Sequence, residues 1–515
     1  MKTLRLMLGI FLSVLMIVGV IPQTIQASAA DTTPDYSYTL TGNMGAVISF
    51  SDIKVTSAVL DNSTLADVTF TDNTVTVTGK SNAAGTALLT VNDTLDFEIP
   101  IGHTTFIMND NTVSVYDGNG ANYEVDGQIY TSTDSQTVIP TKNSDGSYTY
   151  TNTDDYKLNV NVTKAGGTYV FSGIGNDMSI SVNKGLTAKT DILLAGLTLS
   201  SSYTSPVTIK KESTAPVNIK ALQGTVNSLS DSEFNNADTY GDTADGADGT
   251  NAEYAESAVI KAKANSNLTL CGKGTLNIKC VTKNAVKVGE YGTLTIRNII
   301  LNAESAKNGI SCDNIMNINS GVITVDAQGG DAVRSDPDEV NADAGCSAII
   351  NINGGTLNLT ASSDAVQSAQ NVEISGGTFN IKTGAGYNDK SFDKDTMSCK
   401  GIKASANTSD TTDTDTVTDT SESTNTISIT GGTFNLNCAD DAVHSDGYVV
   451  IEGGIFNIYT GDDGVHADTS LTLGKENGDD GAVVINVNTS YEGLEAGSVY
   501  IYIPVRIMFM LLMTV

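Results

Sequence analysis

The sequence repeats the phrase CADDAVHSD, residues Cys438–Asp446, which returns 22 residues later as GDDGVHAD, residues Gly461–Asp468. Looser copies precede it: GDAVRSD at Gly330–Asp336, SDAVQS at Ser363–Ser368 and NGISCD at Asn308–Asp313. Strand-like phrases such as TGGTFNLNC, residues Thr430–Cys438, come before the copies. A unit this short cannot bury its own apolar face and must stack on its neighbours. The repeat therefore predicts an all-β chain whose main part is a right-handed parallel β-helix.

The strand phrase also predicts which side chains face inward. In T-F-N-I the Phe and Ile share one face of the strand, and the Thr and Asn share the other. We expect an interior column of Phe379, Phe434 and Phe456 above Leu357 and Leu276, and a second column of Ile381, Leu436 and Ile458. An outward ladder follows from Asn277, Asn358, Asn380, Asn435 and Asn457. The Gly-Gly pairs at 354/355, 376/377, 431/432 and 453/454 predict the corners, where the backbone needs its freedom.

The chain divides into segments of different character. Residues 1–29 read as a signal peptide, with Lys2 and Arg5, an apolar run and then Ala27-Ser28-Ala29, so we expect export. Short strand signals predict a small immunoglobulin-like β-sandwich at 30–104 and a β-rich connector at 105–154. The β-helix is expected over 155–503, interrupted by an acidic loop at 231–256 and a Ser/Thr/Asp loop at 388–425. The apolar tail at 504–515 breaks the repeat and favours a truncation or a reading-frame error over a membrane anchor, which normally needs about 20 apolar residues.

The net charge and the cysteine content limit which partners and which cross-links the chain can have. The net charge of −31, from 59 acids against 28 bases, argues against a nucleic-acid partner and fits cation binding. The six cysteines show no CxxC spacing, so we expect small buried side chains, with a disulfide between neighbouring coils as the alternative. We expect a monomer.

The repeated acids align into two columns. The first contains Asp331, Asp364, Asp441, Asp463 and Glu492, and the second contains Asp313, Asp336, Asp446 and Asp468. Adjacent coils rise by about 4.8 Å, and two carboxylates at that distance repel by roughly 3 kcal/mol at an effective dielectric of 20. A cation would relieve this repulsion, and oxygen ligands without cysteine favour Ca²⁺ over zinc. The expected calcium ligands are Asp331, Asp336, Asp440, Asp441, Asp446, Asp462, Asp463 and Asp468. The alternative is that each Asp only caps backbone N–H groups at a turn.

Between the acid columns runs a mixed column of Lys287, Ser311, Arg334, Gln367, Lys403, His444, His466 and Glu495. One interpretation is a solvated polar face. The other is a strip that contacts sugar through Arg334, Lys403, His444 and His466, with Ca²⁺ bridging protein and uronate carboxylates. The two histidines lack a third nitrogen or sulfur ligand, which gives zinc little support.

These motifs resemble a family of secreted bacterial β-helix proteins described as carbohydrate-binding domain-containing proteins. The matching residues are Gly376–Ile381, Gly431–Leu436, Asp440–Asp446, Asp462–Asp468 and Ser490–Glu495, and the resemblance covers about 155–503. It implies a pectate-lyase-like fold, a secreted or cell-surface protein, and calcium on Asp440, Asp441, Asp446, Asp462, Asp463 and Asp468. It further implies binding of plant cell-wall polysaccharide, notably acidic pectin (polygalacturonate), without established catalysis. The segment Ile503–Val515 departs from the pattern.

Two functions remain open on the sequence. The first is calcium-dependent, non-catalytic binding of acidic plant polysaccharide. The second is an enzyme on the same fold: a lyase using Arg334 or Lys403 as base beside calcium, or a polygalacturonase using Asp441, Asp462 and Asp463 with His466 nearby. Both acid columns repeat over several coils, as a scaffold would, whereas a catalytic centre is usually one irregular group, so binding is favoured.

Overall fold

A computed structural model gives the fold. It describes residues 35–118, 122–130, 135–163, 166–240, 254–337, 340, 345–405, 424–475, 483–502 and 505–509. The predicted signal peptide at 1–29 lies outside these residues, as do 241–253 of the acidic loop and 406–423 of the Ser/Thr/Asp loop. None of the helices among the described residues is both long and apolar enough to cross a membrane.

The first part of the described chain forms two small antiparallel sheets. One contains β1 (Tyr36–Leu40), β2 (Gly45–Phe50), β5 (Thr74–Gly79) and β4 (Ala66–Phe70), and the other β3 (Ala58–Leu60), β6 (Gly85–Val91) and β7 (Leu95–Ile101). Alternate residues of these strands, among them Ile48, Val75, Leu89 and Ile99, are buried between the sheets.

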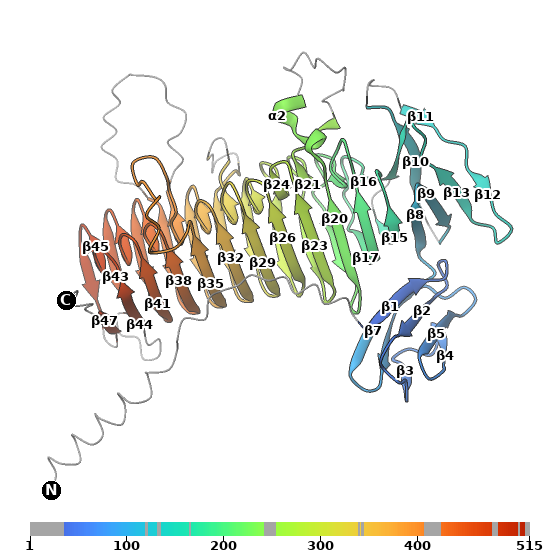
Figure 1. Cartoon of the computed structure of the whole chain (residues 1–515), viewed down its shortest axis with the longest axis horizontal. Helices are drawn as coiled ribbons and strands as arrows, with labels where there is room; N and C mark the ends of the chain where they lie inside the picture. The colour runs from blue at the N-terminus through green and yellow to red at the C-terminus, as the bar shows by residue number, and fades with distance from the viewer. Residues whose placement is uncertain are drawn as a thin grey trace, which may run out of the picture. The chain divides into compact units, whose positions relative to one another are not determined.

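The rest of the chain coils into long parallel ladders, which Figure 1 shows side by side from β15 to β47. A 14-stranded sheet contains β11 (Ser135–Thr137), β10 (Tyr123–Gln128), β14 (Lys157–Val162), β16 (Ser179–Val182), β18 (Val207–Ile209), β21 (Ala258–Ala262), β24 (Asn284–Val288), β27 (Ile310–Cys312), β30 (Val333–Ser335), β33 (Val366–Ser368), β36 (Ile402–Ala404), β39 (Val443–Ser445), β42 (Val465–Ala467) and β45 (Leu494–Ala496). The chain is almost entirely β, with one turn of 3₁₀-helix, η1 (Glu233–Asn235), and a short α2 (Ala237–Tyr240) among the described residues.

A 26-stranded sheet supplies the other faces of the coils. It contains β12 (Thr141–Lys142), β13 (Tyr148–Thr151), β15 (Gly167–Gly175), β17 (Thr190–Ser200), β19 (Val217–Ala221), β20 (Val226–Ser230), β22 (Leu268–Gly272), β23 (Thr275–Cys280), β25 (Thr293–Arg297), β26 (Ile300–Ser305), β28 (Ile315–Ile318), β29 (Val322–Ala327), β31 (Ile349–Ile352), β32 (Thr356–Ala361), β34 (Asn371–Ile374), β35 (Thr378–Thr383), β37 (Thr426–Ile429), β38 (Thr433–Cys438), β40 (Tyr448–Ile451), β41 (Gly454–Thr460), β43 (Ser470–Leu473), β44 (Val483–Thr489), β46 (Val499–Ile501), β47 (Val505–Phe509), β8 (Thr104–Asp110) and β9 (Thr112–Tyr116). Strand β8 pairs in parallel with β15, so coil stacking already begins near residue 104.

Each regular coil contributes three strands. In one coil these are β37, β38 and β39, and they pair in parallel with β40, β41 and β42 of the next. The predicted parallel β-helix is therefore confirmed. Its interior is one apolar cluster that continues through all the coils, because every strand turns alternate side chains inward.

The predicted columns of the core are also confirmed. Phe434 stacks on Phe379 and on Phe456, with ring centroids 4.6 and 4.3 Å apart, and all three side chains are fully buried. Leu357 pairs with Phe379 in the preceding coil, as expected. On the outward face, the amide of each asparagine donates to the next: Asn380 to Asn358, Asn435 to Asn380 and Asn457 to Asn435, at 2.9–3.0 Å.

The Gly-Gly pairs lie at the corners between the first and second strand of a coil. The second glycine of each pair, for example Gly432 with φ +121° and Gly454 with φ +120°, adopts a backbone conformation that other residues rarely take. A Cβ atom at Gly432 would stand 3.0 Å from the ring of Phe434. The corners therefore require glycine for both backbone conformation and space.

The structure also tests the expectations for the cysteines and for the C-terminal tail. All six cysteines are buried thiols rather than disulfides: Cys271, Cys280, Cys312, Cys346, Cys399 and Cys438. Of the tail that was expected to interrupt the repeat, the described residues Val505–Phe509 instead continue it, because β47 pairs in parallel with β44. The alternation of Val505, Ile507 and Phe509 matches the inward residues of β44, which explains the pairing.

Candidate functional site

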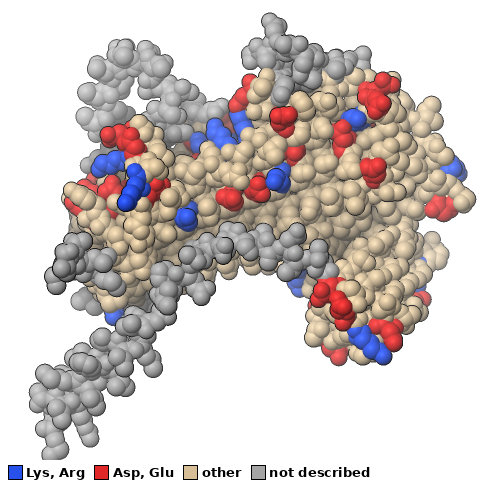
Figure 2. All heavy atoms as spheres, in the orientation of Figure 1, with Lys and Arg blue, Asp and Glu red and all other residues tan. Residues whose placement is uncertain are grey.

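The third strand of each coil carries the repeated phrase, and the structure places its mixed column in a single ladder. Successive partners run from Lys287 through Ser311, Arg334, Gln367, Lys403, His444 and His466 to Glu495, in the order that the sequence predicted. Figure 2 shows acidic and basic side chains interspersed along the edge of the coils, whereas the broad strand face below it carries few charges in that view. The column lies on the 14-stranded sheet, and all its members except Ser311 and Gln367 have ionisable side chains.

The first acid column caps the turns. The amide of Asp463 donates to Oδ1 of Asp441 at 2.9 Å, and the amide of Glu492 donates to Oδ1 of Asp463 at 3.1 Å. Asp331 accepts the amide of Asp364 in the same way at 3.0 Å. The capping role considered for these acids on the sequence is therefore present. It explains how buried carboxylates can stack, because each one bonds the backbone of the following coil.

The other oxygen of each capping acid faces the mixed column. Oδ2 of Asp331 accepts from Arg334 at 3.0 Å, and Oδ2 of Asp364 accepts from Nζ of Lys403 at 3.1 Å. Oδ2 of Asp441 lies 2.8 Å from Nδ1 of His444. The cations of the column are thus held by buried acids of their own or the neighbouring coil, and the exposed fraction of these cationic side chains is between 14% and 26%.

The second acid column holds the same cations from the other side. Asp336 bonds Arg334, and Asp313 bonds Lys287. Asp446 Oδ1 lies 3.2 Å from Nε2 of His444, and Asp468 Oδ1 lies 3.2 Å from Nε2 of His466. Three phrases therefore place a base between two acids of the same coil, around Arg334, His444 and His466. Lys287 and Lys403 instead reach acids of a neighbouring coil.

These contacts limit where calcium fits. Asp331 and Asp336 share the guanidinium of Arg334, which already supplies the positive charge between them. Asp446 and Asp468 contact histidine nitrogens and belong to none of the groups of three metal-competent side chains found among the described residues. Of the expected ligands, Asp440, Asp441 and Asp462 form an all-carboxylate group with oxygens within 4.8 Å of one another. That donor set suits Ca²⁺.

A lysine occupies part of this carboxylate group. Nζ of Lys400 lies 2.6 Å from Oδ2 of Asp440 and 3.0 Å from Oδ2 of Asp441. Asp462 is held more weakly, by Lys394 at 3.8 Å, and burial together with the charge of Asp441 raises its pKa. The group therefore keeps an excess of negative charge around Asp462, although Lys400 neutralises part of it.

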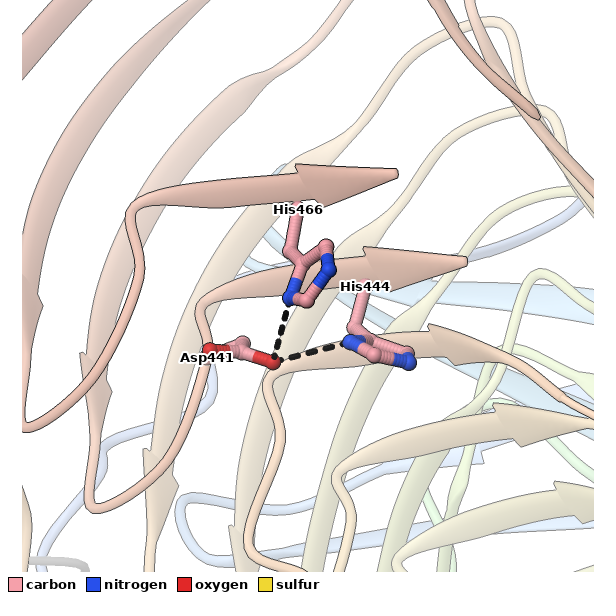
Figure 3. Close-up of side chains that lie close together, drawn as sticks. All are labelled: Asp441, His444 and His466. Carbon is pink, nitrogen blue, oxygen red and sulfur yellow. Dashed lines mark hydrogen bonds and ion pairs between the residues drawn. The ribbon is translucent and has the colours of Figure 1, made fainter. Parts of the chain in front are cut away.

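Two histidines lie beside the same group, as Figure 3 shows. The rings of His444 and His466 stand 4.8 Å apart on adjacent coils, and Nδ1 of His466 lies 3.7 Å from Oδ2 of Asp441. The contact with Asp441 raises the pKa of His466 to about 9, against the opposing effect of burial. Burial raises the pKa of Asp463 to about 7, with a further contribution from its contact with Glu495.

Sequence reasoning gave no role to Lys400, Lys394 or Glu495. Lys400 occupies the position in the first acid column that Asp364 holds in the preceding coil and Asp441 in the following coil. A lysine in a column of acids was the sequence signal that could have indicated an ion pair there. The ε-ammonium reaches the carboxylates of the next coil, a contact that depends on side-chain length and register. Lys394 gave no comparable signal, because its partner lies on another coil. The position of Glu495 after His466 in the mixed column was predicted, but its contact with His466 was not.

Comparisons with known proteins found a matching family and a solved structure that aligns with most of the chain. The profile of a family described as "Carbohydrate-binding domain-containing protein" matches residues 157–464 and 418–501. No curated protein matches the sequence. A polysaccharide lyase-like protein from C. thermocellum, solved as a gadolinium derivative, aligns with a TM-score of 0.32 and 18% identity over 79% of this chain and 99% of its own.

Proposed function

The chain belongs to the family of carbohydrate-binding domain-containing proteins, and on that premise we propose that it binds acidic plant polysaccharide, such as polygalacturonate, with the help of calcium and without cleaving it. The family match spans the coils that carry the charged column, so the polysaccharide is expected to lie along that column. The length of the column suits a polymer better than a single sugar, because successive cations repeat from coil to coil.

The observation that carries the proposal is the continuous ladder from Arg334 through Gln367, Lys403 and His444 to His466. Its members are nitrogen donors, and the spacing between coils is about 4.8 Å. Guanidinium and ammonium groups bond carboxylates and hydroxyls, which are the groups that a polyuronate presents. The side chains of Arg334, Lys403, His444 and His466 are partly exposed and in reach of a ligand, whereas Gln367 is buried. Buried acids fix the positions of the exposed donors.

Calcium is proposed at Asp440, Asp441 and Asp462. Its ligands would be carboxylate oxygens, and the ion would compensate the negative charge that remains around Asp462. Lys400 competes for the same oxygens and must release Asp441 for the ion to bind. A calcium ion at this edge would also present positive charge to a uronate, which a chain of net charge −31 otherwise repels.

The absence of catalysis is part of the proposal. The acids of the first column act as turn caps in coil after coil, which is a structural use that a general acid or base would not repeat. Export is proposed as well, because the substrate of such a module lies outside the cell and residues 1–29 have the composition of a signal peptide.

The deciding experiment is calorimetry of the purified chain with polygalacturonate, in calcium and in EDTA. We expect binding in calcium, weaker binding in EDTA and no change in polymer length. A neutral polysaccharide of similar length is the matched control and should bind less. No binding to any cell-wall polysaccharide in either condition contradicts the proposal.

Product analysis separates the enzymatic alternatives. An unsaturated product that absorbs in the ultraviolet and disappears in Arg334→Ala would identify a lyase. New reducing ends without unsaturation that disappear in Asp463→Asn would identify a hydrolase. Either outcome replaces non-catalytic binding as the function.

A further inference from the structure

The histidine pair belongs to the ladder proposed for polysaccharide, and its geometry also suits a second role, as ligands of a metal ion. Nδ1 of His444 and Nδ1 of His466 both point at one oxygen, Oδ2 of Asp441, at 2.8 and 3.7 Å (Figure 3). The three ligand atoms lie within 4.8 Å of one another. Two ligands of a tetrahedral ion with bonds of about 2.1 Å stand roughly 3.4 Å apart, so these separations bracket the value that an ion requires.

The remaining nitrogens of the two rings are held by acids. Nε2 of His444 faces Asp446 at 3.2 Å, and Nε2 of His466 faces Asp468 at 3.2 Å. Metal-binding histidines usually have their second nitrogen on a carboxylate, which fixes the ring and increases the basicity of the ligating nitrogen. Both histidines, on adjacent coils, have this arrangement. In each of them Nε2 faces the carboxylate and Nδ1 faces Asp441.

Asp441 itself is fixed and buried. Its Oδ1 accepts the amide of Asp463 at 2.9 Å, which leaves Oδ2 for the histidines, and only 3% of its side chain is exposed. The parallel pairing of His444 with His466 sets the distance between the two rings through the backbone. The three side chains are therefore positioned before any ion arrives.

We propose that Asp441, His444 and His466 form a binding site for a divalent transition metal, such as Zn²⁺, Ni²⁺ or Cu²⁺. Two imidazoles and one carboxylate match the preference of these ions for nitrogen, whereas Ca²⁺ takes oxygen ligands. Asp463 Oδ2 and Glu495 Oε2, at 3.5 and 3.7 Å from Nδ1 of His466, stand ready as further ligands. This site goes beyond the proposed function and does not depend on polysaccharide binding.

Protons, Lys400 and calcium would each compete with a transition metal for these ligand atoms. Nδ1 of His444 lies within hydrogen-bond distance of Oδ2 of Asp441, and Nδ1 of His466 lies 3.7 Å from it. Any proton on these nitrogens must leave when a metal ion binds there. Lys400 contacts Asp441 at 3.0 Å but lies nearer to Asp440, at 2.6 Å, so it keeps a carboxylate partner when the ion takes Oδ2. Calcium at Asp440, Asp441 and Asp462 would share Asp441 with this site, so the two ions compete.

The test uses the full chain stripped of metal. Calorimetric titration with Zn²⁺ should give one site per chain, and the electron paramagnetic resonance spectrum of added Cu²⁺ should show coupling to two imidazole nitrogens. His444→Gln and His466→Gln should each weaken Zn²⁺ binding at least tenfold. Glutamine is chosen because Gln367 fills the same column, so the coil accepts that side chain.

A matched control is present in the sequence. The chain has three histidines, and the third, His103, lies outside the column, so His103→Ala should leave Zn²⁺ affinity unchanged. Asp446→Asn should weaken binding by about tenfold, as loss of a carboxylate behind a ligating histidine does. The proposal is overturned by the absence of Zn²⁺ binding, by a Cu²⁺ spectrum without two-nitrogen coupling, or by unchanged affinity in the His444→Gln/His466→Gln double variant.

Discussion

Asp441 and Asp463 occupy equivalent positions in successive coils, and the amide of Asp463 donates to Oδ1 of Asp441 at 2.9 Å. The sequence predicted that the carboxylate of Asp441 would repel that of Asp463. Instead, the carboxylate of Asp441 accepts a hydrogen bond from the backbone of Asp463. Its second oxygen remains available for a cation, which is supplied in this protein by lysine and histidine side chains. One residue type therefore serves both the stacking of the coils and the chemistry of their surface.

The capping bond makes a prediction about stability. Asp463→Ala leaves the amide of Glu492 without its acceptor and should lower the free energy of unfolding by about 1–3 kcal/mol. Asp463→Asn keeps an oxygen acceptor and should cost clearly less. Denaturant unfolding of both variants measures the difference, and equal losses would show that the cap contributes little.

The aromatic column makes a second prediction. Phe434→Ala should cost about 3–5 kcal/mol, because it opens a cavity between the stacked rings of Phe379 and Phe456. Phe434→Leu should cost much less, since Leu357 fills the same column in an earlier coil. Thermal unfolding of the two variants checks the order. A similar loss in both would mean that ring stacking, rather than volume, stabilises these coils.

Lys400 provides a test of calcium binding. Lys400→Met removes the ammonium that lies on Asp440 and Asp441, so calcium should bind more tightly and stabilise the variant more than the natural chain. The measurement is the melting temperature with calcium and with EDTA. Asp441→Asn combined with Asp462→Asn should abolish the difference. If EDTA changes neither protein, the carboxylates act only in capping and ion pairing.

Asp336 distinguishes two roles for the acids around Arg334. Asp336→Asn removes one carboxylate from the guanidinium, so Arg334 should become more available and polygalacturonate should bind a few-fold more tightly. A calcium ligand at this position would give the opposite result. Arg334→Ala should weaken binding by a modest factor, and Lys382→Ala, a change on β35 outside the column, serves as the control. Calorimetry at low salt is the measurement, since screening reduces such attractions.

The coil register could be predicted from the sequence because it follows from local repetition. A 22-residue period with Phe, Ile and Asn at fixed places determines which residues face inward and which stack, and the structure confirms the Phe434 column, the asparagine ladder and the order from Lys287 to Glu495. The Gly-Gly corners follow for the same reason. A parallel β-helix brings equivalent residues of adjacent repeats together, so one-dimensional spacing becomes a three-dimensional column.

The partners of the charged side chains were decided by the tertiary structure. The sequence placed Asp331 and Asp336 among calcium ligands, but Arg334 lies between them, and Lys400 reaches Asp440 and Asp441 from an earlier coil. Long side chains choose among several acids within reach, and loops of unequal length separate those acids in the sequence. The convergence of two imidazoles on a single oxygen of Asp441 depends likewise on ring orientation, which the backbone period does not determine.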